Sequence, residues 1–124
     1  MFELDITKEF SAAHCLRGYP GDCARLHGHN WTVQVFIAAD RLDEVGIAMD
    51  FRLLKQELNA VLAEFDHKYL NDLPMFSDRN PTSENIAMYI YGRLKPAVAA
   101  SAPHARLSRV RICESPNSGA SYSE

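Results

Sequence analysis

The chain has 124 residues and a formal net charge of −3, with 47% hydrophobic and 23% charged residues. This composition predicts one globular domain over residues 1–124, and the net charge provides no global basic field that would attract nucleic acid or anionic lipid. No apolar run approaches the roughly 20 residues that cross a membrane, and the acidic, alternating first residues are unlike a secretory signal. We therefore expect a cytoplasmic protein whose three cysteines form no disulfide framework.

Two strands are predicted at the start of the chain. Residues 2–10 alternate between apolar and polar side chains, which is typical of a half-buried strand. Residues 15–25 contain several Gly, Pro and Asp residues and predict a loop. Residues 30–39 predict the second strand, and its expected inward side chains are Trp31, Val33, Val35 and Ile37.

Two helices are predicted next. Asp50 is the expected N-cap of a helix over 51–65, because apolar residues recur there at steps of three and four. The expected buried stripe of this helix is Phe51, Leu54, Leu58, Val61, Leu62 and Phe65. Thr82 is the expected N-cap of a second helix, which we expect to end at Pro96.

A third strand is predicted over about residues 106–113, and a short fourth over 119–123. Because strands and helices are grouped along the chain, we expect an α+β fold with two helices on one face of a four-stranded antiparallel sheet. Such a sheet has two open edges, and pairing with another subunit is one way to satisfy them.

Three of the five histidines lie within the first 29 residues and predict a metal site. His27 and His29 are two residues apart, so in an extended segment both side chains point to the same face. His14 lies at the end of the first strand, and the 12-residue connection to His27 allows the two segments to pair as a hairpin. Zinc is the expected ion, because three imidazoles suit it and leave one coordination position free. The alternative is three unrelated, partly buried histidines, and the His-x-His spacing favours the metal.

Cys23 lies four residues before His27, within the predicted loop. Three interpretations stay open for it: a small buried hydrophobe, a fourth metal ligand that closes a structural site, or a reactive thiol beside the cation. The spacing alone does not separate a ligand from a base.

Two further sites carry carboxylates. Asp66 and His67 follow the first predicted helix, and a histidine beside a carboxylate is a candidate for proton transfer, although such pairs also act as helix caps. Glu114 ends the third predicted strand. Its carboxylate is either solvated or able to accept two parallel hydrogen bonds from the edge of a heterocycle such as a pterin or guanine.

Taken together, these residues resemble the family of 6-pyruvoyl- and 6-carboxy-tetrahydropterin synthases. The segments around Asp66 and Pro81, and the short length, look most like the bacterial 6-carboxy branch of the queuosine (7-deazaguanine) pathway. The segments that carry the resemblance are residues 10–14, 23–29, 49–51, 66–71, 80–85 and Glu114.

The resemblance implies the tunnelling fold, with subunits joined through their sheet edges into trimers or a dimer of trimers, and with active sites at the interfaces. It implies that zinc is bound by His14, His27 and His29, and that Cys23 is the proton-abstracting base. By the same resemblance Asp66 and His67 complete the proton relay. It also implies that Glu114 anchors the pterin ring and that Ser83 lines the pterin pocket.

The implied reaction is that of a zinc-dependent carbon–carbon lyase. It converts 7,8-dihydroneopterin triphosphate to 6-carboxy-5,6,7,8-tetrahydropterin, acetaldehyde and triphosphate. Arg17, Arg25 and Lys68 are candidate triphosphate contacts, because they lie near the motifs. Two alternatives stay open: the pyruvoyl-forming enzyme, which only eliminates triphosphate, and a non-catalytic, zinc-stabilised assembly module with Cys23 as fourth ligand.

Overall fold

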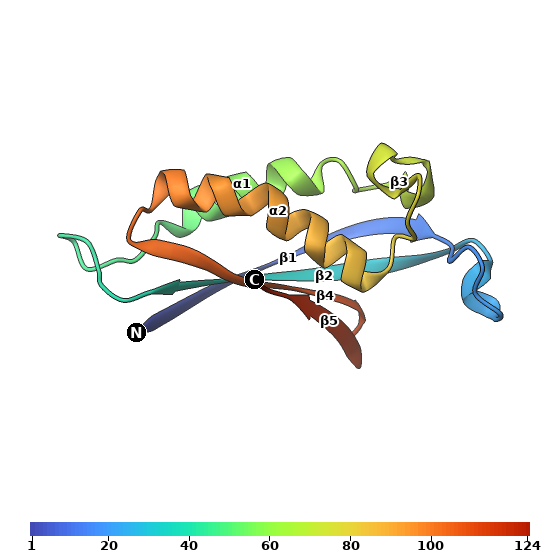
Figure 1. Cartoon of the computed structure of the whole chain (residues 1–124), viewed down its shortest axis with the longest axis horizontal. Coiled ribbons are helices and arrows are strands. Elements are labelled where there is room, and N and C mark those ends of the chain that lie inside the picture. Colours follow the sequence, from blue (N-terminus) through green and yellow to red (C-terminus); the bar gives the residue numbers. More distant parts are fainter.

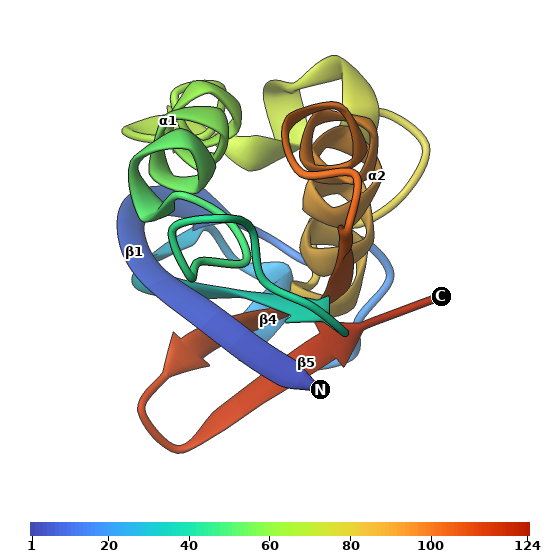
Figure 2. The ribbon, with the colours of Figure 1, turned by 90° about the vertical axis from the view of Figure 1, so that its left-hand side faces the viewer.

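A five-stranded sheet covered on one face by two helices makes up the fold (Figure 1). The computed structural model describes the whole chain, residues 1–124. The two helices lie on the same side of the sheet when the molecule is viewed end-on (Figure 2). The elements are, in chain order, β1 (Phe2–His14), η1 (Asp22–Ala24), β2 (His27–Ala39), α1 (Phe51–Leu62), β3 (Lys68–Tyr69), η2 (Leu70–Asp72), η3 (Pro74–Phe76), α2 (Ser83–Ser101), β4 (Ala105–Ser115) and β5 (Ser118–Tyr122).

The sheet has the strand order β3-β1-β2-β4-β5, and all neighbours are antiparallel except β1 and β3. β1 and β2 form a long hairpin whose register runs from Phe2 opposite Ala39 to His14 opposite His27. β1 is longer than the predicted 2–10 because the pairing with β2 continues through the small residues that follow Phe10. The hairpin therefore ends where the histidines begin.

The prediction of four antiparallel strands omitted β3. This fifth strand pairs in parallel with β1 at Ala12 and Ala13. Its two residues are too few for a periodic pattern, and it forms because the chain turns back at His67, whose φ is 59°. The α+β class and the placement of both helices on one face are confirmed.

The core lies between the sheet and the helices. Alternate side chains of β2 point into it and are fully buried: Trp31, Val33, Val35 and Ile37. α1 contributes a stripe of the predicted spacing: Leu54, Leu58, Val61 and Leu62. Phe51 was predicted to be buried but is 49% exposed, because the first turn of α1 borders a surface pocket that Phe2 and Ile47 also line.

α2 does not end at Pro96, as predicted, but continues to Ser101. A proline inside a helix removes one backbone hydrogen bond, which favours an end at that point. Here the side chains beyond it, Val98 and Ala102, are buried in the core, and their burial offsets the lost bond. Neither helix is both long and apolar enough to cross a membrane.

Candidate metal centre

Three imidazoles meet at the end of the β1–β2 hairpin. One ligand atom of each of His14, His27 and His29 lies within 4.8 Å of the others. His14 comes from the last position of β1 and lies opposite His27 in the register, while His29 follows two residues later on the same face of β2. The convergence expected from the His-x-His spacing and the hairpin is therefore present.

Main-chain carbonyls orient two of these rings. His14 Nδ1 lies 2.8 Å from the carbonyl oxygen of Pro81, and His27 Nδ1 lies 2.7 Å from that of Arg25. A ring whose Nδ1–H donates to a carbonyl keeps the lone pair of Nε2 for a metal.

The Nε2 atoms of His14 and His29 are buried and have no hydrogen-bond partner. Buried polar atoms in native proteins are nearly always satisfied, and a shared cation would satisfy both. The donor set therefore fits a transition metal, and three neutral nitrogen ligands with no thiolate fit zinc.

Burial also favours the protonation state that a ligand requires. The pKa of His14 is lowered, chiefly because the ring is removed from water, and that of His29 is lowered for the same reason. The Glu114 carboxylate acts in the opposite direction on both rings. The net effect keeps the two imidazoles neutral near pH 7, as metal binding demands.

Glu114 extends from β4 to the border of this histidine cluster. Its Oε2 lies 3.5 Å from His29 Nε2, and its Oε1 accepts a hydrogen bond from the hydroxyl of Ser83 at 3.3 Å. Ser83 is the first residue of α2 and is buried. The two residues expected to bind a pterin are thus in contact with each other and next to the histidine cluster.

Asp66 and His67 form a second polar group, in the turn between α1 and β3. Asp66 Oδ1 lies 3.0 Å from His67 Nδ1 and also accepts the backbone N–H of Ser11 at 3.0 Å. The Ser11 N–H is the largest cause of the lowered pKa of Asp66, so this carboxylate is ionised at neutral pH. The imidazole of His67 is exposed and is oriented by a charged neighbour, an arrangement suited to proton transfer.

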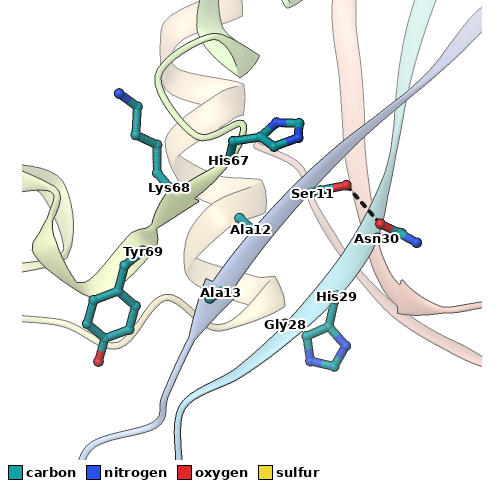
Figure 3. A pocket seen from close by; sticks show the side chains of 9 residues that line it. All are labelled: Ser11, Ala12, Ala13, Gly28, His29, Asn30, His67, Lys68 and Tyr69. Carbon is teal, nitrogen blue, oxygen red and sulfur yellow. Dashed lines mark hydrogen bonds between the residues drawn. The ribbon is translucent and has the colours of Figure 1, made fainter.

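His67 and His29 line the same open pocket, which has a volume of about 580 Å³. Figure 3 shows His67, Lys68 and Tyr69 on the segment beside β1, with His29 projecting from β2. The side chain of Ser11 donates to Asn30 Oδ1 between them, at 2.8 Å.

Cys23 lies apart from both polar groups. It belongs to the short helix η1 in the loop between β1 and β2 and is partly buried. Its thiol is not among the ligand atoms that cluster within 4.8 Å, and it does not line the His67 pocket. Within one chain, therefore, the structure brings Cys23 neither into the ligand set nor beside Asp66 and His67.

Sequence reasoning missed the contacts made by the segment before α2. Arg17, which the sequence suggested as a triphosphate contact, instead donates to the main-chain carbonyls of residues 76, 77 and 79. The Pro81 carbonyl that orients His14 was not foreseen, because a main-chain acceptor leaves no mark in the sequence. The only signal was the position of Asn80 and Pro81 directly before a helix cap.

Comparison with known proteins supports an assignment. The chain is 40% identical to the 6-carboxy-5,6,7,8-tetrahydropterin synthase of Synechocystis sp., over 94% of this chain and 91% of that protein. It is 38% identical to the enzyme of that name from Bacillus subtilis, over 76% of this chain and 66% of the other. The structure of Caenorhabditis elegans 6-pyruvoyl tetrahydropterin synthase superposes with a TM-score of 0.87 at 31% identity, covering 99% of this chain and 95% of the other.

A family model described as 6-pyruvoyl tetrahydropterin synthase matches residues 3–124, which is nearly the whole chain. The histidine cluster and the Ser83–Glu114 contact lie within the matched segment. The chain belongs to the 6-pyruvoyl tetrahydropterin synthase family.

Proposed function

We propose that the protein is a zinc-dependent 6-carboxy-tetrahydropterin synthase. The observation that carries this proposal is the set of three imidazoles with two unpartnered Nε2 atoms, bordered by the Glu114 carboxylate. The 40% identity of the chain to a relative named 6-carboxy-5,6,7,8-tetrahydropterin synthase favours the carboxy-forming reaction. The substrate is then 7,8-dihydroneopterin triphosphate, and the pathway is that of queuosine.

Each residue of the proposal has a role that its position allows. His14, His27 and His29 hold zinc, which when bound polarises the side-chain hydroxyls of the substrate and acidifies the adjacent C–H. Glu114 accepts hydrogen bonds from the amidine-like edge of the pterin, and the Ser83 hydroxyl orients the carboxylate.

Proton transfer falls to the remaining residues. The Cys23 thiolate removes a proton from the substrate, and His67 returns one, with its ring held by Asp66. Loss of triphosphate and cleavage of the carbon–carbon bond of the side chain, with one water consumed to form the carboxylate, then give 6-carboxy-tetrahydropterin, acetaldehyde and triphosphate.

We infer that the complete site lies between subunits of a homo-oligomer. Cys23 and His67 do not meet within one chain, so a neighbouring chain would supply one of them. The sheet has edges that allow such pairing, since β3 covers only Ala12 and Ala13 of the outer edge of β1. Trimers, or two stacked trimers, are the expected assembly.

Product analysis tests the reaction. The purified protein, loaded with zinc and incubated with the triphosphate, is expected to release acetaldehyde and a carboxy-pterin, which mass spectrometry identifies. The pyruvoyl-forming reaction, favoured by the likeness to the Caenorhabditis elegans enzyme, would give a pyruvoyl product and no acetaldehyde. If neither product forms, the lyase proposal is wrong.

The Cys23→Ala variant tests the role of the thiol. Its main-chain carbonyl, which accepts from Leu16 N at 2.7 Å, is unaffected by the change, so the loop is expected to keep its fold. Loss of a general base predicts a fall in turnover of about 100-fold or more, with unchanged zinc content. Loss of zinc together with the fold would instead support a structural site with Cys23 as a ligand.

A further inference from the structure

We propose that Arg17 and Asn80 are positioning residues of the metal centre. Neither is a candidate ligand, and neither forms a hydrogen bond with one of the three imidazoles. Together they fix the segment before α2. The carbonyl of Pro81 in this segment orients His14, and Ser83, two residues later, donates a hydrogen bond to Glu114. This inference rests on the proposed function, because it assumes that the cluster binds zinc.

The guanidinium group of Arg17 gathers the chain just before α2. Its Nη2 donates to the carbonyl of Arg79 at 2.9 Å and to that of Phe76, and its Nη1 donates to that of Ser77 at 3.3 Å. Its Nε donates to the Asn80 side chain at 3.3 Å. Four acceptors in one fork use the geometry that distinguishes arginine from lysine.

Asn80 returns the contact to the backbone of Arg17. Its Oδ1 accepts the Arg17 N–H at 2.9 Å, and its Nδ2 donates to the Arg17 carbonyl at 3.0 Å. The amide therefore pairs with the backbone as a neighbouring strand would. The Asn80 carbonyl in turn accepts from Thr82 N at 2.9 Å and from Asn85 Nδ2 at 2.8 Å.

The residue after Asn80 connects the paired side chains of Arg17 and Asn80 to the histidines. Pro81 is buried, and its carbonyl lies 2.8 Å from His14 Nδ1. Two residues later, the Ser83 hydroxyl donates to Glu114 at 3.3 Å. A shift of the segment that Arg17 and Asn80 hold would therefore move the partner of a ligand and the partner of the substrate anchor at once.

Arg17 and Asn80 lie outside the hydrophobic core of 28 buried residues, and Arg17 is exposed. Loss of an outer partner of a metal ligand lowers metal affinity by about 10- to 100-fold in other metal sites. We expect a loss of that size from Arg17→Met and from Asn80→Ala.

Zinc affinity, measured by competition with a chromophoric chelator, provides the test. The visible absorption bands of the cobalt-substituted protein report the ligand geometry directly. Arg41→Met is the matched control, since Arg41 is an exposed arginine that makes no hydrogen bond or ion pair. Ile37→Val controls for lost stability, because this buried residue lies opposite Leu4, toward the end of β2 far from the histidines. Arg17→Lys, which keeps the charge but not the fork, provides a milder variant.

The inference is supported if Arg17→Met and Asn80→Ala weaken zinc binding about tenfold or more and alter the cobalt bands, while both controls match the wild type. The zinc affinity of Arg17→Lys is then expected to lie between those of the wild type and Arg17→Met. Wild-type zinc affinity and spectrum in folded Arg17 and Asn80 variants would overturn the inference and leave the proposed function intact. It is also overturned if Ile37→Val changes both readouts equally. Absence of zinc binding by the wild type would reject the proposed function and the inference together.

Discussion

Glu114→Gln removes a charge from the proposed pterin site and keeps the shape of the side chain. Glu114 Oε1 accepts from Ser83 at 3.3 Å, and Oε2 lies 3.5 Å from His29 Nε2. Glutamine can keep one of these oxygens but presents an NH₂ group in place of the other. It can no longer accept two parallel hydrogen bonds from an amidine-like edge.

The size of the effect follows from the hydrogen bond that is lost. A hydrogen bond to a charged group contributes about 1.5–3 kcal/mol, and 1.4 kcal/mol corresponds to a factor of ten, so kcat/KM is expected to fall about 10- to 150-fold. Zinc content is expected to stay unchanged, since the ligand cluster contains only the three imidazoles.

Steady-state kinetics with the triphosphate, together with metal analysis, measures both quantities. Glu84→Gln is the matched control, because Glu84 is an exposed carboxylate that follows Ser83 in the first turn of α2. A Glu114→Gln enzyme with kcat/KM within twofold of the wild type would refute the assignment of Glu114 as substrate anchor. A loss of zinc in this variant would show that the carboxylate belongs to the metal site.

Three further predictions concern stability and metal. In the metal-free protein, burial lowers the pKa of His14 and His29, so below about pH 6.5 the unfolded chain binds more protons than the folded one. The free energy of unfolding should therefore fall from pH 7 toward pH 5 in urea titrations, and a constant value would contradict this account. Zinc at about 100 times its Kd should stabilise the fold by about 2.7 kcal/mol, and a chelator should reverse the shift in thermal midpoint. Pro96→Ala should restore the backbone hydrogen bond to Gly92 and stabilise α2 by up to about 3 kcal/mol, so an unchanged or lower thermal midpoint would count against it.

Much of the candidate metal centre follows from local pattern. His27 and His29 are two residues apart on an extended segment, so their side chains share a face. Trp31, two residues further along, is buried, so the same alternation places both histidines on the face of the sheet that Trp31 occupies. Predicting the hairpin required only the assumption that the neighbouring strand ends at His14, and the register confirms this assumption. The helix caps Asp50 and Thr82 were also predicted correctly, because capping depends on one side chain and the first turn.

The rest depends on contacts between distant parts of the chain. β3 exists because Lys68 and Tyr69 meet β1, 56 residues earlier in the register, and no pattern in two residues predicts that pairing. α2 continues past Pro96 because Val98 is buried in the core. The burial of Val98 outweighs the tendency of proline to end a helix. The main-chain partners of Arg17 are likewise invisible before the fold is known.

The backbone at His67 has one more consequence. Its φ of 59° lies in the left-handed region, where a residue with a side chain costs about 1 kcal/mol or more relative to glycine. Two contacts hold it there: its N–H donates to the carbonyl of Ser11 at 2.6 Å, and its ring faces Asp66. Glycine would remove this backbone cost but would also lose the contact with Asp66. If His67 transfers a proton, as we propose, the need for an imidazole opposes the preference of this backbone conformation for glycine, and activity and folding stability make conflicting demands on one residue.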